Sequence, residues 1–293
     1  MICPCCNGKK FIDISLREDK IENQSFKYVK CINCNITVSS PIPSDNLLTK
    51  VYSDFFNYDW YKKVAIFKKI QARKRFWMLK KYFSTSTKHL DVGSNYGYFV
   101  NLLRDKEIDS YGYDISLTKE QKKSPYFYDD LESIGMTFDV ITMFHSLEHI
   151  PDITSFIKRL KKLLNKDGIL IIFIPNYQSI GQKIKQRDWV WLQQPYIHIW
   201  QFSKKNIELF LQRNGFSVIK IWTKDAWDAN IYDYTFLSKL SSVIDRLFLK
   251  KIDRVYIESI VRIFTLLPSS LLNIIFFKYF PYGSELIVVV KNE

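Results

Sequence analysis

One short segment places two histidines and a glutamate together after a hydrophobic run. In FHSLEHIPD, His145 directly follows the predicted strand FDVITMF, and Glu148 and His149 come three and four positions later. If this segment turns helically, the three side chains lie on one face. Imidazole titrates near neutral pH, so we predict His145 as a general base, with Glu148 or His149 orienting it or the substrate.

Other interpretations of this segment compete with catalysis. The spelling H-x-x-E-H matches an inverted zinc-protease motif, but that motif needs an active-site helix with a distant third ligand, and this segment follows a predicted buried strand. We therefore do not favour a protease. His149 can also cap and pack the turn before Pro151, and for this residue alone we favour that structural role, although it stays a candidate catalytic residue.

A further histidine lies in an aromatic segment. His198, in PYIHIWQFS, has Trp189, Trp191, Tyr196 and Trp200 around it in the chain. Such rings can stack on a sugar or form ordinary core. We predict His198 as a substrate contact or a second base.

A glycine-containing turn follows the predicted strand KHLDV. In DVGSNYG, Gly93 and Gly97 let the backbone turn tightly and let a ligand approach, while the next helix points its amides toward that ligand. The dinucleotide pattern G-x-G-x-x-G is not present, because Asn95 stands where a second glycine would admit a pyrophosphate. NAD is therefore a poor fit.

Acidic residues follow three successive predicted strands. Asp91 ends the first, Asp114 ends the second 23 residues later, and Asp130 follows the third in YDDLES. Asp114 is placed to accept hydrogen bonds from ribose hydroxyls, and Asp130 is placed to contact an adenine amine. Together the three form an anionic line that suits a cationic ligand.

Four of the five cysteines form two C-x-x-C pairs, Cys3 with Cys6 and Cys31 with Cys34. Reduced thiolates at this spacing can close a tetrahedral Zn²⁺ site, and a segment this short otherwise lacks a core. We expect a zinc ribbon over residues 1–40, with Cys5 as the spare thiol. Two thiol pairs without metal are the alternative.

The elements that must position these residues alternate between strand and helix from residue 87 onward. This alternation predicts an open, mostly parallel α/β sheet covered by helices, with ligands at the carboxyl ends of its strands. We divide the chain into the ribbon, a linker with a basic helix over 41–86, and a third domain over 87–293 that carries a helical insertion at 229–283.

The net charge of +13 is concentrated in one place, because residues 61–90 hold ten lysines and arginines and no acid. A helix is predicted here from Ala72, Phe76, Leu79 and Phe83, which recur at helical spacing. Its basic side can meet a phosphate-rich substrate, an anionic membrane or RNA, or it can be an ordinary solvated surface.

Hydrophobic content of 47% with no apolar run of eighteen residues predicts a soluble globular protein. The start MICPCCNGKK lacks the apolar core of a signal peptide, so we expect a cytoplasmic protein that can also lie at the inner face of the membrane. The 229–283 stretch can cap the acceptor pocket, form a homo-oligomer surface or lie in the membrane interface, and we favour packing.

Over residues 87–293 the sequence resembles class I S-adenosylmethionine-dependent methyltransferases. The resemblance rests on LDVGSNYG, YGYDIS, DDLES, FDVITMFHSLEHIPD, LNKDGILIIFIPN and HIWQFSKKNIELFLQRNGFSVI. The last two blocks are similar to bacterial cell-surface sugar and polysaccharide methyltransferases, which often begin with a two-knuckle zinc module. The resemblance to class I methyltransferases implies a Rossmann-like seven-stranded sheet in which the last strand, SELIVVVKN, inserts antiparallel beside FSVIKIW.

The resemblance also implies roles for individual residues. Those that would line the S-adenosylmethionine site are Asp91, Gly93 and Gly97 for the methionine part, Asp114 for the ribose and Asp130 for the adenine, together with Asn95, which replaces the middle glycine of the family pattern, and Phe144. The segment around His198 would border the acceptor pocket. Ubiquinone-type O-methyltransferases hold a divalent cation with a Glu-x-x-Glu-His at the place of His145, so a His-Glu-His metal site is an alternative.

From these observations we expect an O-methyltransferase that acts on a sugar of a glycan or of its nucleotide- or lipid-linked precursor. An RNA methyltransferase that grips phosphates with its ribbon and basic helix is the second hypothesis, although we do not expect a nucleic-acid partner because the charge is confined to one helix. A non-catalytic ligand-binding protein is the third.

Overall fold

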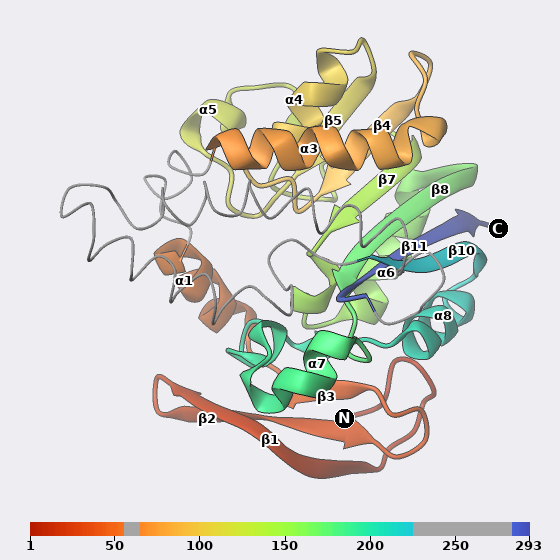
Figure 1. The fold of residues 1–293 in the computed structure, drawn as a ribbon. Coiled ribbons are helices and arrows are strands. Elements are labelled where there is room, and N and C mark those ends of the chain that lie inside the picture. Colours follow the sequence, from red (N-terminus) through yellow and green to blue (C-terminus); the bar gives the residue numbers. More distant parts are fainter. Residues whose placement is uncertain (56–64, 225–282) are drawn as a thin grey trace, which may run out of the picture.

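The computed structural model describes residues 1–55, 65–224 and 283–293 (Figure 1). Seven strands form the larger sheet, in the spatial order β10-β11-β8-β7-β4-β5-β6. They are β4 (Lys88–Val92), β5 (Asp109–Tyr113), β6 (Phe127–Tyr128), β7 (Phe138–Phe144), β8 (Leu164–Pro175), β10 (Phe216–Lys224) and β11 (Glu285–Asn292). The first five of these pair in parallel, whereas β11 runs antiparallel to both β8 and β10. The predicted Rossmann-like sheet with an antiparallel last strand is confirmed.

Side chains alternate between the two faces of this sheet and divide the core in two. Val140 of β7 packs with α3 (Ala65–Leu79) and α4 (Tyr98–Arg104). Its neighbour Ile141 packs on the other face, with α6 (Ile153–Leu163) and α8 (Lys204–Arg213). β8 and β11 are buried on both faces, which explains their nearly continuous runs of isoleucine, leucine and valine.

A second sheet has four strands in the order β1-β2-β3-β9. The first three are β1 (Phe11–Ile21), β2 (Gln24–Cys31) and β3 (Thr37–Ser40), and each pairs antiparallel with the next. The fourth, β9 (Trp200–Gln201), comes from the far half of the chain and pairs with β3 through Thr37 and Val38. The N-terminal strands are therefore joined by main-chain hydrogen bonds to the segment that carries His198.

The segment expected to be a linker contains an additional helix, α1 (Asp45–Phe55). The predicted basic helix corresponds to α3, which begins at Ala65 and ends at Leu79, followed by a 3-10 turn over Lys80–Tyr82. Two short helices, α5 (Lys119–Lys122) and α7 (Ile180–Lys185), lie in loops after β5 and β8. The predicted insertion lies outside the described residues except for Gly283. Within the described ranges, no helix is long and apolar enough to cross a membrane.

Candidate active site

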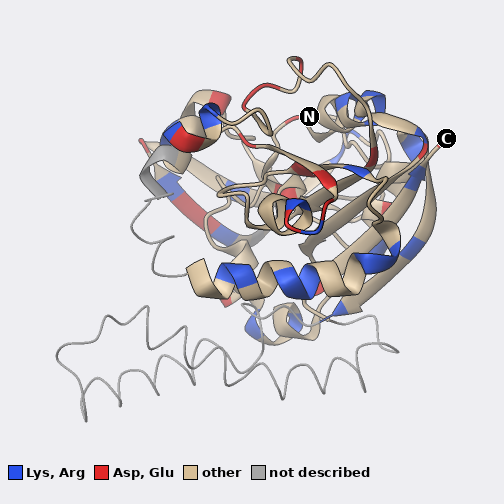
Figure 2. Cartoon of the chain, turned by 90° about the horizontal axis from the view of Figure 1, so that it is seen from above, with Lys and Arg blue, Asp and Glu red and all other residues tan. Residues whose placement is uncertain are grey.

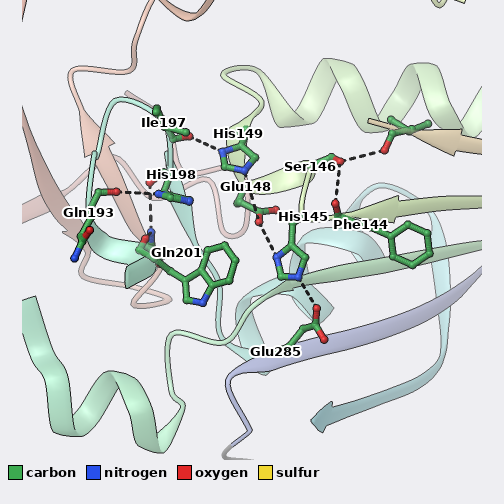
Figure 3. A network of polar contacts seen from close by, with 12 residues as sticks. Phe144, His145, Ser146, Glu148, His149, Gln193, Ile197, His198, Gln201 and Glu285 are labelled. Carbon is green, nitrogen blue, oxygen red and sulfur yellow. Dashed lines mark hydrogen bonds and ion pairs between the residues drawn. The ribbon is translucent and has the colours of Figure 1, made fainter. Parts of the chain in front are cut away.

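His145 lies at the carboxyl end of β7 with its ring held between two carboxylates (Figure 3). Its Nδ1 atom is 3.3 Å from Oε1 of Glu148, and its Nε2 atom contacts Oε1 of Glu285 on β11. The ring also stacks on Trp191, with centroids 4.9 Å apart and planes inclined by 5°. The backbone of His145 is left-handed, at φ 54°, which turns the ring from the strand direction toward these neighbours.

The electrostatics of this group make His145 a cation. Burial disfavours the charge, but Glu285 and Glu148 outweigh it and raise the pKa of His145 to about 9. Burial likewise opposes ionisation of Glu285, yet Lys224, whose Nζ lies 2.5 Å from Oε2, and His145 lower its pKa. An imidazolium with a carboxylate at each nitrogen has no lone pair for a substrate proton. This geometry makes His145 a hydrogen-bond donor and does not favour the base role predicted for it.

The Nδ1 atoms of His149 and His198 are both held by backbone carbonyl groups. Nδ1 of His149 lies 2.8 Å from the carbonyl oxygen of Ile197, and Nδ1 of His198 lies 2.8 Å from that of Gln193. A carbonyl oxygen only accepts, so each Nδ1 carries a proton and donates it to that carbonyl. Burial lowers the pKa of His198 to about 4. The two rings are 5.0 Å apart, so they belong to one cluster.

Glu148 lies at the centre of this cluster. Its side chain is 1% exposed, and although Oε1 forms an ion pair with the His145 ring, neither carboxylate oxygen has a partner with hydrogen-bond geometry among the described residues. Its Oε1 atom is 3.9 Å from Nε2 of His149 as well as close to His145. Burial opposes its ionisation, but these two histidines lower its pKa. A buried carboxylate with unused acceptor capacity is suited to bind a polar group of a ligand.

Two hydrogen bonds to backbone carbonyls hold the His198 segment at the end of β7. The amide of Ile199 donates to the carbonyl of Glu148, at 2.9 Å, and the indole of Trp200 donates to the carbonyl of Ile150, at 2.8 Å. Of the four aromatic residues singled out in the sequence, only Trp191 has a ring stacked on this cluster. Trp189 is fully buried and packs with Tyr28, as core.

The loop between β4 and α4 has the backbone that the glycine pattern predicts. Gly93, Asn95 and Gly97 all have positive φ, of 76°, 50° and 71°. A Cβ atom at Gly93 would lie 2.1 Å from Oγ of Ser146, and one at Gly97 would lie 2.5 Å from the Phe127 ring. At both positions a side chain would therefore clash with neighbouring protein groups, and the positive φ of the turn also favours glycine. The close approach of Gly93 to Ser146 also places this loop beside the His145 segment.

Two of the three predicted acids adjoin this loop. Asp114 accepts hydrogen bonds from the amides of Asn95, at 2.8 Å, and Ser116, at 2.9 Å, one on each oxygen. Asp91 is buried at the end of β4, and burial raises its pKa to about 7. Asp130 is exposed after β6 and accepts from the amide of Glu132.

Asp91 is held by a buried polar chain that sequence reasoning missed. The hydroxyl of Thr142 donates to Asp91, at 2.6 Å, and therefore accepts from Nε2 of His89, at 2.9 Å. Nδ1 of His89 then accepts from the hydroxyl of Ser110, at 2.8 Å. Burial lowers the pKa of His89 to about 3, so the ring is neutral and serves this network.

The predicted cysteines come together at the end of the small sheet. The sulfur atoms of Cys3, Cys6, Cys31 and Cys34 all lie within 4.8 Å of one another. In a tetrahedral site with Zn–S bonds of about 2.3 Å, sulfurs are about 3.8 Å apart, and the Cys3–Cys34 and Cys6–Cys31 separations are 3.4 and 3.6 Å. The remaining thiol, Cys5, is fully buried but is not one of these four.

A family model described as a methyltransferase domain matches residues 63–221, more than half of the chain. The chain belongs to this family. The methyltransferase match spans the sheet from β4 into β10, and with it the loop after β4 and the histidine cluster. The sequence-based expectation of a methyltransferase with the class I fold is therefore confirmed.

Two solved structures are similar to this chain, and the first of them shows the same fold. The crystal structure of magnesium protoporphyrin IX methyltransferase from Synechocystis PCC 6803, with bound SAH, has 14% sequence identity and a TM-score of 0.51, and the match covers 85% of this chain and 100% of that one. A SAM-dependent methyltransferase from Archaeoglobus fulgidus has 19% identity and a TM-score of 0.48, with 80% and 100% covered. The comparison with curated proteins gave no match.

Proposed function

We propose that this methyltransferase uses S-adenosylmethionine to O-methylate a sugar hydroxyl of a cell-surface glycan or of its nucleotide- or lipid-linked precursor. The observation that carries the proposal is the position of Glu148, a buried carboxylate without a hydrogen-bond partner among the described residues, between His145 and His149 and beside the loop after β4. The bound SAH in a protein of the same fold supports the choice of cofactor.

The residues around the loop after β4 fit this cofactor. Each carboxylate oxygen of Asp114 accepts one hydrogen bond from a backbone amide. Each oxygen has a second lone pair, so Asp114 retains acceptor capacity for two ribose hydroxyls. Asp91, at the end of β4, is assigned to the methionine part, and Asp130, after β6, is assigned to the adenine. Bound S-adenosylmethionine supplies an electrophilic methyl group on a positively charged sulfur.

The proton of the acceptor hydroxyl needs a base, and we assign this role to His149 in place of His145. Nδ1–H of His149 donates to the Ile197 carbonyl, so Nε2 is the nitrogen at which this ring can take up the proton of the hydroxyl. Proton transfer from the hydroxyl to Nε2 produces an imidazolium, and the Glu148 carboxylate 3.9 Å away stabilises that charge. His145 keeps Glu148 in place and adds positive charge to the site.

Aromatic rings beside the cluster favour a sugar as the acceptor. Trp191 covers the His145 ring and makes an edge contact with His198 at 5.5 Å. The indole thus forms part of the wall of the site, and such faces stack on the apolar side of a sugar ring. Glu148, His149 and His198 then supply the polar contacts that hydroxyl groups need.

The metal-assisted alternative gains no support from the geometry. Within the described ranges, the four cysteines are the only group of three or more His, Cys, Asp or Glu residues found to hold ligand atoms close enough for a metal ion. His145 is committed to two carboxylates instead. We propose that the cysteines bind one structural Zn²⁺, because four thiolates at these separations match its preferred ligand set.

Methyl transfer to candidate acceptors tests the proposed function. The protein is incubated with S-adenosylmethionine labelled in its methyl group and with a panel of nucleotide sugars, lipid-linked sugars and short RNAs, and the label is located by mass spectrometry. We expect label on a sugar oxygen, and its loss in Glu148→Gln. The assignment of the acceptor would be overturned if the label appeared on RNA, or if another class of acceptor were methylated and no sugar were.

A further inference from the structure

The outward side of α3 carries exposed apolar side chains in one line. Ile66 is 65% exposed and Trp77 is 71% exposed, the highest exposure among the large hydrophobic side chains of the described residues. They are eleven positions apart. At about 100° per residue, eleven positions bring a side chain back to the same side of a helix. Two bulky apolar groups therefore point to solvent from one stripe.

Four cations share that stripe. Lys69 and Arg73 lie between Ile66 and Trp77, and both are exposed on the same side of the helix. The other two, at its end, are the exposed Lys80 and Lys81. The Nζ atom of Lys80 lies 5.4 Å from the centre of the Trp77 ring. Figure 2 shows the basic bands along α3, and the sequence from 61 to 90 contains no acid to neutralise them.

The opposite side of α3 holds the helix against the methyltransferase sheet. Ala72 and Leu79 are buried in the core with α4 and the central strands. The Arg75 guanidinium lies 4.1 Å from the centre of the Phe144 ring, the residue directly before His145. The buried side of α3 therefore packs in the core, whereas the side chains of the exposed stripe face solvent.

We propose that the stripe formed by Ile66, Lys69, Arg73, Trp77, Lys80 and Lys81 docks the protein on an anionic lipid bilayer. Tryptophan prefers the boundary between headgroups and acyl chains, an aliphatic side chain enters the acyl region, and each flanking cation is attracted to anionic headgroups. RNA would engage the cations and stack on the indole, but it offers no apolar environment to the exposed isoleucine at the start of the stripe.

Docking through α3 has a consequence for the reaction. The helix that meets the bilayer also contacts Phe144, so the acceptor cluster is held next to the docking element. A lipid-linked sugar would then meet the enzyme at the membrane surface. This consequence rests on the proposed function, whereas the docking itself does not and is tested without cofactor or acceptor.

Co-sedimentation of the full chain with vesicles tests the proposal. Vesicles of mixed phosphatidylglycerol and phosphatidylcholine should bind the protein, with affinity that falls as salt is raised, and phosphatidylcholine alone should bind it far less. Lys69→Glu with Arg73→Glu should weaken binding roughly tenfold or more. Ile66→Ser with Trp77→Ser should weaken it by a similar factor while leaving the charge unchanged.

A matched control changes the same charge elsewhere. Lys158 and Lys162 are exposed on α6, on the other face of the sheet, and Lys158→Glu with Lys162→Glu should bind the vesicles as the wild type does. Circular dichroism confirms that each variant is folded. The proposal is overturned if the anionic vesicles do not sediment the wild type, if both stripe variants bind unchanged, or if single-stranded RNA binds through the stripe and vesicles do not.

Discussion

The Tyr28 hydroxyl donates a hydrogen bond to the carbonyl oxygen of His198, 2.8 Å away. Tyr28 is fully buried on β2, in the N-terminal module that carries the cysteines. The side-chain amide of Gln201 donates both to this hydroxyl, at 3.2 Å, and to the carbonyl of Trp191, at 2.8 Å. The N-terminal module therefore positions two residues of the proposed acceptor site, in addition to forming its own small sheet.

Tyr28→Phe should reduce kcat/KM for the acceptor while leaving S-adenosylmethionine affinity unchanged. The substitution removes one buried hydrogen bond from the His198 segment, which costs about 1–2 kcal/mol. That corresponds to a loss of roughly fivefold to thirtyfold in kcat/KM. Initial rates and calorimetry measure the two quantities. Tyr111→Phe, on β5 and away from this segment, is the matched control, and an equal effect in both variants would remove the positioning role from Tyr28.

His149→Ala should lower kcat by roughly a hundredfold or more, because the acceptor hydroxyl loses its base. His149→Gln separates this chemistry from the hydrogen bond to Ile197, since an amide can still donate to a carbonyl but takes up no proton. We expect both variants to be similarly slow, and added imidazole to restore part of the activity of His149→Ala. Near-normal rates in His149→Gln would reduce His149 to a structural residue.

Local patterns were sufficient for much of the fold and part of the site. The turn residues Gly93 and Gly97, the acid Asp114 and the two cysteine pairs are each recognised from a few neighbouring positions, and the structure puts them where the patterns indicate. The antiparallel place of β11 came from resemblance, since nothing in SELIVVVKN specifies its direction. The predicted roles of the cofactor-binding acids stay predictions.

The features that the sequence did not predict depend on contacts between residues that are far apart in the chain. Glu285 meets His145 across 140 residues, and Lys224 joins the same group, so no local spacing could reveal that His145 is held as a cation. The pairing of β3 with β9 is equally distant, because a two-residue strand has no periodicity of its own. His89 was overlooked because a histidine inside a hydrophobic strand gives no signal of the buried polar chain around it.

Glu285→Gln should move the basic limb of the pH profile of kcat to lower pH. Activity that needs the His145 cation is present below its pKa, about 9, and falls as the pH rises through that value. Glu285 raises this pKa, so its neutral replacement lowers it. Rates measured from neutral to alkaline pH check the shift. Glu208→Gln on α8 should leave the limb in place, and an unshifted limb in Glu285→Gln would show that His145 does not control it.

Cys31→Ser should abolish zinc binding and lower the melting temperature, because one of four thiolate ligands is lost. Cys5→Ser should retain one zinc per chain, since Cys5 is not one of the four cysteines whose sulfur atoms come together. Metal analysis of the purified variants by mass spectrometry gives the zinc content. Zinc retained in Cys31→Ser and lost in Cys5→Ser would reassign the ligands.

Calorimetric titration of the pure protein with S-adenosylmethionine is the most direct test of the central claim. One cofactor per chain should bind, S-adenosylhomocysteine should compete for the same site, and Asp114→Ala should weaken both roughly tenfold or more because the loop and the ribose lose a shared carboxylate. An absence of heat with either compound, together with clear binding of NADH, would contradict the account.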